Sequence, residues 1–269
     1  MDPLRDALAL GLVQGLGYVL PVSSDGHLAL MQLLFGIQQP APWLGVCLRA
    51  ATFLATCIAL RERCGRMLRD LSASVLQPAR LWSTPGGRDA LVVLLASIPT
   101  AVFGVFLREP MSVWSHSPLV IGIGLLGTSA WLLSTYWLRA GRQETPGLIG
   151  GLLIGVAQGL SILPGLSRSA GTIACALWLG VRPDRAFELS FLCSLPPLLA
   201  MIVIDARVAL QHATPSTHVA LASLTTLIAA LVGFGILERV MRHLRLAGFA
   251  LWTVPLALAT LAMALVWPH

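Results

Sequence analysis

The sequence contains no lysine and is poor in charge of either sign. Only 11% of its 269 residues are charged, against about a quarter in an ordinary soluble domain. Such a chain cannot cover a water-soluble surface of this size. The five cysteines lie singly, and an odd number without close pairs argues against a disulfide framework and against a thiolate metal site.

Apolar residues make up 56% of the chain, and the mean hydropathy is +0.80. A membrane-spanning helix needs about 20 mostly apolar residues. Six stretches qualify, at about 43–60, 90–107, 117–138, 186–204, 217–237 and 248–266. The sequence therefore predicts an all-α integral membrane protein. Its formal charge of +6 is then explained by topology, and we expect no nucleic-acid partner.

An internal repeat stands out among the apolar runs. Residues 11–27 read GLVQGLGYVLPVSSDGH and residues 155–172 read GVAQGLSILPGLSRSAGT. Aligned with one gap, Gln14 meets Gln158, Pro21 meets Pro164 and Ser24 meets Ser167. Repeats of this kind indicate that a structural unit occurs twice.

Both copies interrupt an apolar run with Gly, Pro and Ser, within 4–36 and 147–180. Irregular backbone inside a membrane is tolerated only when it is buried in protein or lines a watery cavity. We therefore expect two re-entrant helical hairpins, each followed by three spans. They would divide one membrane domain, 1–269, into halves 1–138 and 147–269.

The arginine positions test this arrangement. With non-crossing hairpins, thirteen of the eighteen arginines fall on one side, which marks that side as cytoplasmic. The chain would then have both termini outside. Because each half has an odd number of spans, the second hairpin is inverted relative to the first, as in many secondary transporters whose site lies where broken helices meet.

The polar residues of the two hairpins form the candidate site. Ionisable groups at membrane depth are costly, so they favour a functional interpretation. The first hairpin supplies Ser23, Ser24, Asp25 and His27, and the second supplies Ser167, Arg168, Ser169 and Thr172. The other ionisable groups at membrane depth are Arg49 and Glu188. A structural ion pair of Arg168 with Glu188 or Asp25 is the alternative to a functional role.

This set of residues suits a phosphate. Arginine offers a planar fork to an anion, and hydroxyls and helix N-termini add donors. Ser24 and His27, three residues apart, would share a helical face. A serine beside an imidazole is a minimal pair of nucleophile and proton acceptor.

The same residues resemble the undecaprenyl-diphosphate phosphatase family of the bacitracin-resistance type. PVSSDGH at 21–27 resembles its first box, and PGLSRSAGTI at 164–173 resembles its second. The resemblance runs over most of the chain. It implies six spans plus two opposed hairpins, and hydrolysis of the polyprenyl diphosphate carrier to the monophosphate at the periplasmic face of the bacterial inner membrane.

The resemblance also implies roles for particular residues. Ser24 matches the family's essential serine, His27 its box histidine and Arg168 its essential arginine. Ser167, Ser169 and Thr172 fall in its second box as candidates for phosphate contact; from the residues themselves we add Ser23 and Arg49 as phosphate contacts. The supporting positions, also taken from the residues and not from the resemblance, are Gln14, Tyr18, Asp25, Gln158 and Glu188.

The sequence departs from the family pattern at three places. Gln14 and Tyr18 stand where the family has a Glu-x-x-x-Glu pair linked to Mg²⁺ or Ca²⁺ dependence, and an amide and a phenol cannot replace two carboxylates for such ions. Arg49 stands where the family usually has glutamine. Trp252 and Thr253 stand where a Tyr-Arg pair is expected.

These departures leave several functions open. In the first, Arg49 and Arg168 clamp the diphosphate without a metal. In the second, catalysis is lost and the fold binds or translocates a polyprenyl phosphate, which the match of Gln14 with Gln158 favours. In the third, the protein sequesters the lipid diphosphate in regulation or immunity. Small residues at 122–130 suit close helix contact, either internally or in a homodimer.

Overall fold

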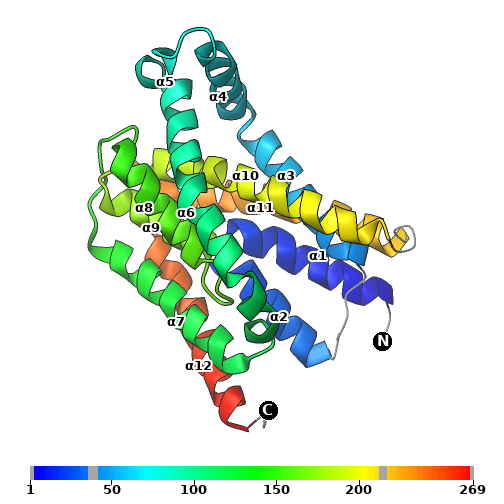
Figure 1. Cartoon of the computed structure of the whole chain (residues 1–269). Coiled ribbons are helices and arrows are strands. Elements are labelled where there is room, and N and C mark those ends of the chain that lie inside the picture. The colour runs from blue at the N-terminus through cyan, green and yellow to red at the C-terminus, as the bar shows by residue number, and fades with distance from the viewer. Residues whose placement is uncertain (1–2, 36–41, 212–216, 267–269) are drawn as a thin grey trace.

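The computed structural model describes residues 3–35, 42–211 and 217–266, and every regular element within them is helical. A single isolated bridge joins Gln143 to Val181. The α-helices are α1 Pro3–Val19, α2 Ser24–Phe35, α3 Pro42–Ala59, α4 Arg61–Ser74, α5 Arg80–Ser83, α6 Pro85–Trp114, α7 Pro118–Ser134, α8 Gly147–Leu160, α9 Arg168–Trp178, α10 Pro183–Ala209, α11 Thr217–Arg242 and α12 Ala250–Val266 (Figure 1). The prediction of an all-helical protein is confirmed.

Five segments of the described chain are long and apolar enough to cross a membrane. They are Pro85–Leu107, Pro118–Trp137, Pro183–Ala209, Thr217–Arg242 and Leu246–Val266. A sixth span is obtained when Trp43–Ala59 is joined to Arg61–Ser74, although the two are bent by 87°. The five segments and Trp43–Ala59 lie where the sequence predicts apolar spans, whereas Arg61–Ser74 lies outside them.

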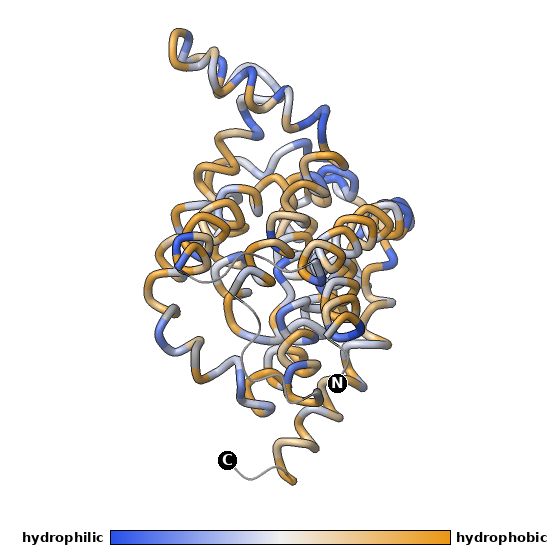
Figure 2. Tube along the Cα trace, turned by 90° about the vertical axis from the view of Figure 1, so that its right-hand side faces the viewer, coloured by the Kyte–Doolittle hydropathy of each residue, from blue (hydrophilic) through white to orange (hydrophobic). Residues whose placement is uncertain are grey.

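The outer surface of the helix bundle is apolar. Val105, Phe106, Leu251 and Leu265 are each more than three-quarters exposed, and Figure 2 shows hydrophobic residues along most of the helices. In water such a surface would aggregate, whereas a lipid surrounding removes the cost of exposing it. The protein is a multi-pass membrane protein.

The first broken segment is formed by α1 and α2, joined by a short turn. Ser23, in this turn, has a φ of 71°, the left-handed region that few residues other than glycine adopt. Gly17 lets the two helices approach, because a Cβ there would lie 2.9 Å from the Cα of Ser24. The chain therefore reverses direction within four residues of the end of α1.

The second broken segment is formed by α8 and α9. Its turn needs a glycine at Gly165, whose φ is +89°. Helix α7 holds this turn: the Thr128 hydroxyl donates to the Gly165 carbonyl at 2.7 Å and accepts from the Ser167 N–H at 2.7 Å. The structure thus places a helix break in each repeat, where the sequence predicts one.

The two halves of the chain interlock through these broken segments. Helix α1 packs along α11 of the second half, and α8 packs along α6 of the first half. The contacts match: the Thr226 hydroxyl donates to the Gly11 carbonyl at 3.0 Å, and the Thr100 hydroxyl donates to the Gly155 carbonyl at 3.2 Å. Glycines at these positions permit close approach of the backbones.

A network of charged side chains lies near the starts of α4, α6 and α10. Arg185, at the start of α10, is almost fully buried and pairs with Asp89 and Glu188. Arg63 approaches the same Glu188 carboxylate at 2.9 Å. Paired in this way, these charges avoid the cost of isolated burial. Glu188, which the sequence offers as a supporting site residue, belongs to this network and makes no ion pair with Arg168 in the described structure.

Candidate functional site

The turns of the two broken segments touch each other. A Cβ added to Gly26 at the start of α2 would lie 3.0 Å from the Cα of Gly165. The N-termini of α2 and α9 therefore lie close together. The first N–H groups of a helix have no intrahelical acceptor and carry partial positive charge, so this junction favours an anion.

A serine caps each of these helix N-termini. The Ser23 hydroxyl accepts from the Gly26 N–H at 3.2 Å, and the Ser167 hydroxyl accepts from the Ala170 N–H at 3.3 Å. Ser23 and Ser167 therefore occupy equivalent positions in the structure. The sequence alignment instead pairs Ser24 with Ser167, so the two comparisons differ by one residue. In structural terms Ser24 matches Arg168, and both are the first residue of a helix.

The guanidinium of Arg168 lies against two neighbouring aromatic rings. Its Cζ lies 4.5 Å from the centre of the Tyr18 ring and 5.2 Å from that of Phe191. One terminal nitrogen, Nη2, donates to the Tyr18 carbonyl at 3.3 Å. The other, Nη1, is buried and has no hydrogen-bond partner, and among the described residues no carboxylate pairs with Arg168. A buried donor left unpaired in this way favours an anionic ligand.

The other predicted phosphate contacts of the second hairpin are partly used by the fold. The Thr172 hydroxyl is buried, donates to the Arg168 carbonyl and lies 2.6 Å from Ser190 Oγ. The hydroxyls of Ser167 and Ser169 lie 3.3 Å apart, and Ser169 also donates weakly to the Leu20 carbonyl at 3.4 Å. Ser169 is therefore the most available of these hydroxyls, because its bonds are long.

His27 and Ser24 share the first turn of α2 but are not hydrogen-bonded to each other. The Nδ1 of His27 lies 2.8 Å from the Ser23 carbonyl oxygen, and its Nε2 lies 2.9 Å from the indole nitrogen of Trp252 on α12. Ser24 is half-buried, and no described group hydrogen-bonds its hydroxyl. The sequence predicts the Ser-His pair; the involvement of Trp252 comes from the structure.

Arg49 is engaged away from Arg168. Its guanidinium pairs with Asp205 near the end of α10, and the Arg49 side chain is about one-third exposed. Asp205 lies just outside the predicted span 186–204, so the sequence does not identify it as the partner of Arg49. The charge of Arg49 is thus already paired with a carboxylate, and the clamp of Arg49 and Arg168 predicted from the sequence is not formed in this structure.

The predicted supporting residues Gln14, Tyr18, Asp25 and Gln158 lie in different surroundings. Gln158 is buried and donates to Thr100 and to the Cys193 carbonyl, both at 3.1 Å, so it helps to hold α8 in place. Gln14 is also buried, within α1. Tyr18, whose hydroxyl lies 3.0 Å from Ser194 Oγ, lies directly against Arg168. Asp25 is exposed at the start of α2.

The donor set at the turns does not fit a divalent metal. Mg²⁺ and Ca²⁺ take carboxylate and other oxygen ligands, and the described residues contain no group of three or more His, Cys, Asp or Glu side chains that could hold a metal ion. Tyr18 directs its ring towards Arg168, and Asp25 is the one acid of the first turn. We therefore derive no step through a metal.

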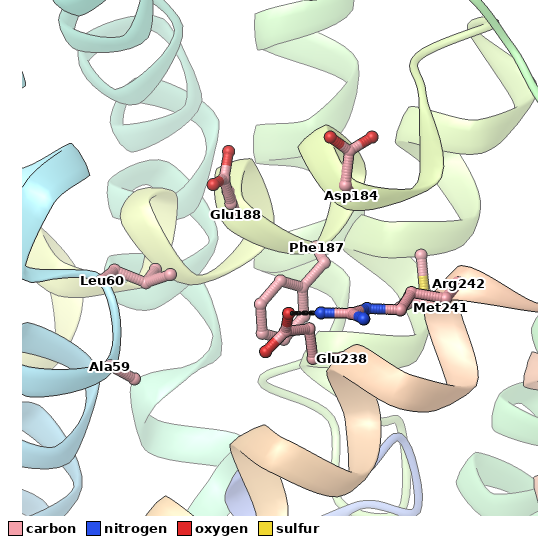
Figure 3. Close-up of a pocket in the computed structure, with 8 residues that line it drawn as sticks. All are labelled: Ala59, Leu60, Asp184, Phe187, Glu188, Glu238, Met241 and Arg242. Carbon is pink, nitrogen blue, oxygen red and sulfur yellow. Dashed lines mark hydrogen bonds and ion pairs between the residues drawn. The ribbon is translucent and has the colours of Figure 1, made fainter.

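A cavity of about 210 Å³ lies away from the two turns. Its lining residues are Ala59, Leu60, Asp184, Phe187, Glu188, Glu238, Met241 and Arg242 (Figure 3). Of these, only Glu188 is a predicted site residue. The charges are already paired, since Glu238 accepts from Arg242 at 2.7 Å and Glu188 pairs with Arg63. The chemistry of the turns, not this cavity, identifies the site.

Comparisons with known proteins identify the family of the chain. A model of the family described as bacitracin resistance protein BacA matches residues 7–259. A protein of Korarchaeum cryptofilum named undecaprenyl-diphosphatase is 32% identical over 262 residues, covering 97% of this chain and 99% of the relative. A protein of Desulfosudis oleivorans with the same name is 34% identical over 261 residues, covering 94% of each.

The match begins within α1 and ends within the last apolar span, so it covers the turns of both broken segments. It therefore includes every residue of the two turns, from Ser23 to His27 and from Ser167 to Thr172. The chain belongs to the bacitracin resistance protein BacA family.

Proposed function

We propose that this protein hydrolyses undecaprenyl diphosphate, or a related polyprenyl diphosphate, to the monophosphate. The observation that carries the proposal is Arg168, at the N-terminus of α9, whose Nη1 is buried and has no hydrogen-bond partner. A diphosphate supplies the oxygens that this donor lacks. The names of the relatives, undecaprenyl-diphosphatase, agree with that substrate.

In the proposed reaction, Arg168 and the N–H groups of the two turns bind the phosphate oxygens and stabilise the charge that grows in the transition state. Either Ser24 attacks the terminal phosphorus and a water then hydrolyses the phosphoserine, or Ser24 orients a water that attacks directly; both routes release inorganic phosphate and restore Ser24. The proton of that nucleophile goes to Nε2 of His27. The bond between the terminal phosphorus and the bridging oxygen breaks, and the prenyl monophosphate leaves.

The proposed membrane arrangement is six spans with two re-entrant hairpins that enter from opposite sides. The matched contacts of Gly11 with Thr226 and of Gly155 with Thr100 support an inverted repeat. The arginine distribution supports termini outside the cytoplasm. We propose the bacterial inner membrane as the location, with the reaction at its periplasmic face.

The competing function, translocation of a polyprenyl phosphate, needs the halves to move against each other. Each broken segment packs on a helix of the opposite half, so simple rocking of one half would disrupt both matched contacts. This packing favours hydrolysis in a fixed site.

The test is phosphate release from a C15 and a C55 prenyl diphosphate by the purified protein. We expect Ser24→Ala and Arg168→Ala each to lower kcat/KM at least about a hundredfold, the scale of losing a transition-state contact. Thr225→Ala on α11, which loses only a bond to its own helix, is the matched control. Absence of release by the wild type, with prenyl phosphate still bound through Arg168, would instead identify a carrier.

A further inference from the structure

His27 and Trp252 meet edge to edge. Their ring planes are 15° apart and their centroids 6.2 Å apart, while Nε2 and the indole nitrogen are 2.9 Å apart. These values describe two nearly coplanar rings side by side, not a face-to-face stack. The indole N–H therefore points along the in-plane lone pair of Nε2, the best direction for a hydrogen bond.

This contact fixes the tautomer of His27. The Ser23 carbonyl can only accept, so Nδ1 carries the proton in their 2.8 Å bond. The Trp252 indole can only donate, so Nε2 offers its lone pair. His27 is held neutral, and both ring nitrogens already have a partner.

A lone pair that accepts a hydrogen bond from Trp252 is not free to accept a proton. The proposed reaction requires Nε2 to take the proton of Ser24 or of a water. In the structure no hydrogen bond joins His27 to Ser24, so the resting contact occupies the catalytic atom. The indole must leave Nε2 before the base can act.

An anionic oxygen is the partner that would draw the indole away. Trp252 is 58% exposed, so its ring has room to turn. Hydrogen bonds to a charged acceptor are roughly twice as strong as neutral ones, which makes a phosphate oxygen a better acceptor than imidazole. Arg168, on the turn that touches the α2 turn, would bring that phosphate to the same place.

We propose that Trp252 is a positioning residue that masks Nε2 of His27 until a phosphate oxygen of the substrate accepts its N–H. The masking keeps the imidazole in the tautomer that the reaction needs and makes its release depend on the ligand. This inference rests on the proposed hydrolysis for its purpose. The masking itself can be measured without activity.

The first test is the rate at which diethyl pyrocarbonate modifies His27, read by mass spectrometry of the ligand-free protein. Trp252→Phe keeps an aromatic ring but removes the donor, and we expect about two- to tenfold faster modification, the effect of losing one hydrogen bond. His243, which is exposed, is the internal reference. Trp137→Phe is the matched control, because Trp137 is exposed in the short helical turn Thr135–Trp137 that follows α7. In this variant the reagent should modify His27 at the wild-type rate.

Two further measurements separate the outcomes. In Trp252→Phe we expect KM for the prenyl diphosphate to rise severalfold while kcat does not fall, because a phosphate donor is lost and the base is unmasked. In the wild type, ¹⁵N spectra of the histidines should show His27 protonated at Nδ1, whether or not any variant folds. Equal modification rates in the Phe variant and the wild type, or a His27 protonated at Nε2, would overturn the masking. A wild type without phosphatase activity overturns the proposed function instead.

Discussion

At the scale of single residues, the site depends on a cation with no anion beside it. Arg168 is held by the Tyr18 and Phe191 rings and by a backbone carbonyl. A ring face positions a guanidinium without neutralising it, whereas a carboxylate would compete with the substrate. Tyr18, at a position where the family resemblance leads one to expect glutamate, thus keeps the positive charge of Arg168 available.

Tyr18 should therefore act through its ring more than through its hydroxyl. We expect Tyr18→Leu to raise KM about threefold to tenfold, because a cation–π contact contributes about 0.5–2 kcal/mol. Tyr18→Phe keeps the ring and loses only the bond to Ser194, so its KM should stay within about threefold of the wild-type value. Steady-state kinetics of both variants check this, and similar losses in the two would contradict it.

Metal removal is the second prediction at this scale. Because no carboxylate cluster lies among the described residues and Arg168 supplies the charge, we expect activity to persist in excess chelator. The measurement is phosphate release before and after chelation, followed by addition of Mg²⁺ or Ca²⁺. Complete loss of activity that either ion restores would refute metal-free catalysis.

At the scale of elements, the α8–α9 turn is held from outside. Thr128 of α7 satisfies one carbonyl and one N–H of that turn, and it is fully buried. Irregular backbone at membrane depth needs such partners. The start of α9, and with it Arg168, is therefore positioned by a neighbouring helix.

Replacing Thr128 by Val would leave both of those backbone groups unpaired. We expect the free energy of unfolding to fall by about 2 kcal/mol or more, since each buried unsatisfied group costs about 1–3 kcal/mol. Thermal unfolding in detergent measures the change. Thr225→Val, which loses only a bond to Leu221 within its own helix, should differ little from the wild type; equal effects of the two substitutions would show that α7 does not hold the turn.

Sequence reasoning predicts the elements better than their partners. Apolar length and the Gly-Pro-Ser interruptions locate the spans and both breaks, because these depend on local composition. They do not reveal that Trp252 reaches His27 or that Asp205 pairs with Arg49, since those contacts join residues more than 150 positions apart. The sequence alignment of the repeat pairs Ser167 with Ser24, whereas the structure shows that Ser167 corresponds to Ser23, because these two serines cap their helices. Capping hydrogen bonds cannot be seen in a comparison of residue types alone.

At the scale of the whole molecule, the two halves are held together by matched glycine contacts. A Cβ on Gly11 would overlap the Ala222 carbonyl, and a Cβ on Gly155 would overlap the Ala96 carbonyl, whereas Gly235 on α11 has open space. Helix contacts in membranes rely on such close packing. Gly11 and Gly155 therefore occupy equivalent close contacts, one in each half of the chain.

Gly11→Ala and Gly155→Ala should destabilise the protein to a similar extent, about 1–3 kcal/mol each, as overpacking does. Gly235→Ala should be neutral or slightly stabilising, because alanine favours a helix. The midpoint of thermal unfolding in detergent ranks the three. A marked difference between the first two would mean that the halves do not share the contact equally.

The interlocking of the halves also sets the order in which the molecule can be built. Helix α1 is synthesised well before α11, against which it packs, because Gly11 and Thr226 are 215 residues apart. Throughout most of translation the polar turn of the first hairpin has no shelter from the second half, and contacts so distant in sequence form slowly. Helix α1 therefore reaches its final packing only after α11 has been made, and until then the proposed site at the turn that follows α1 is not assembled.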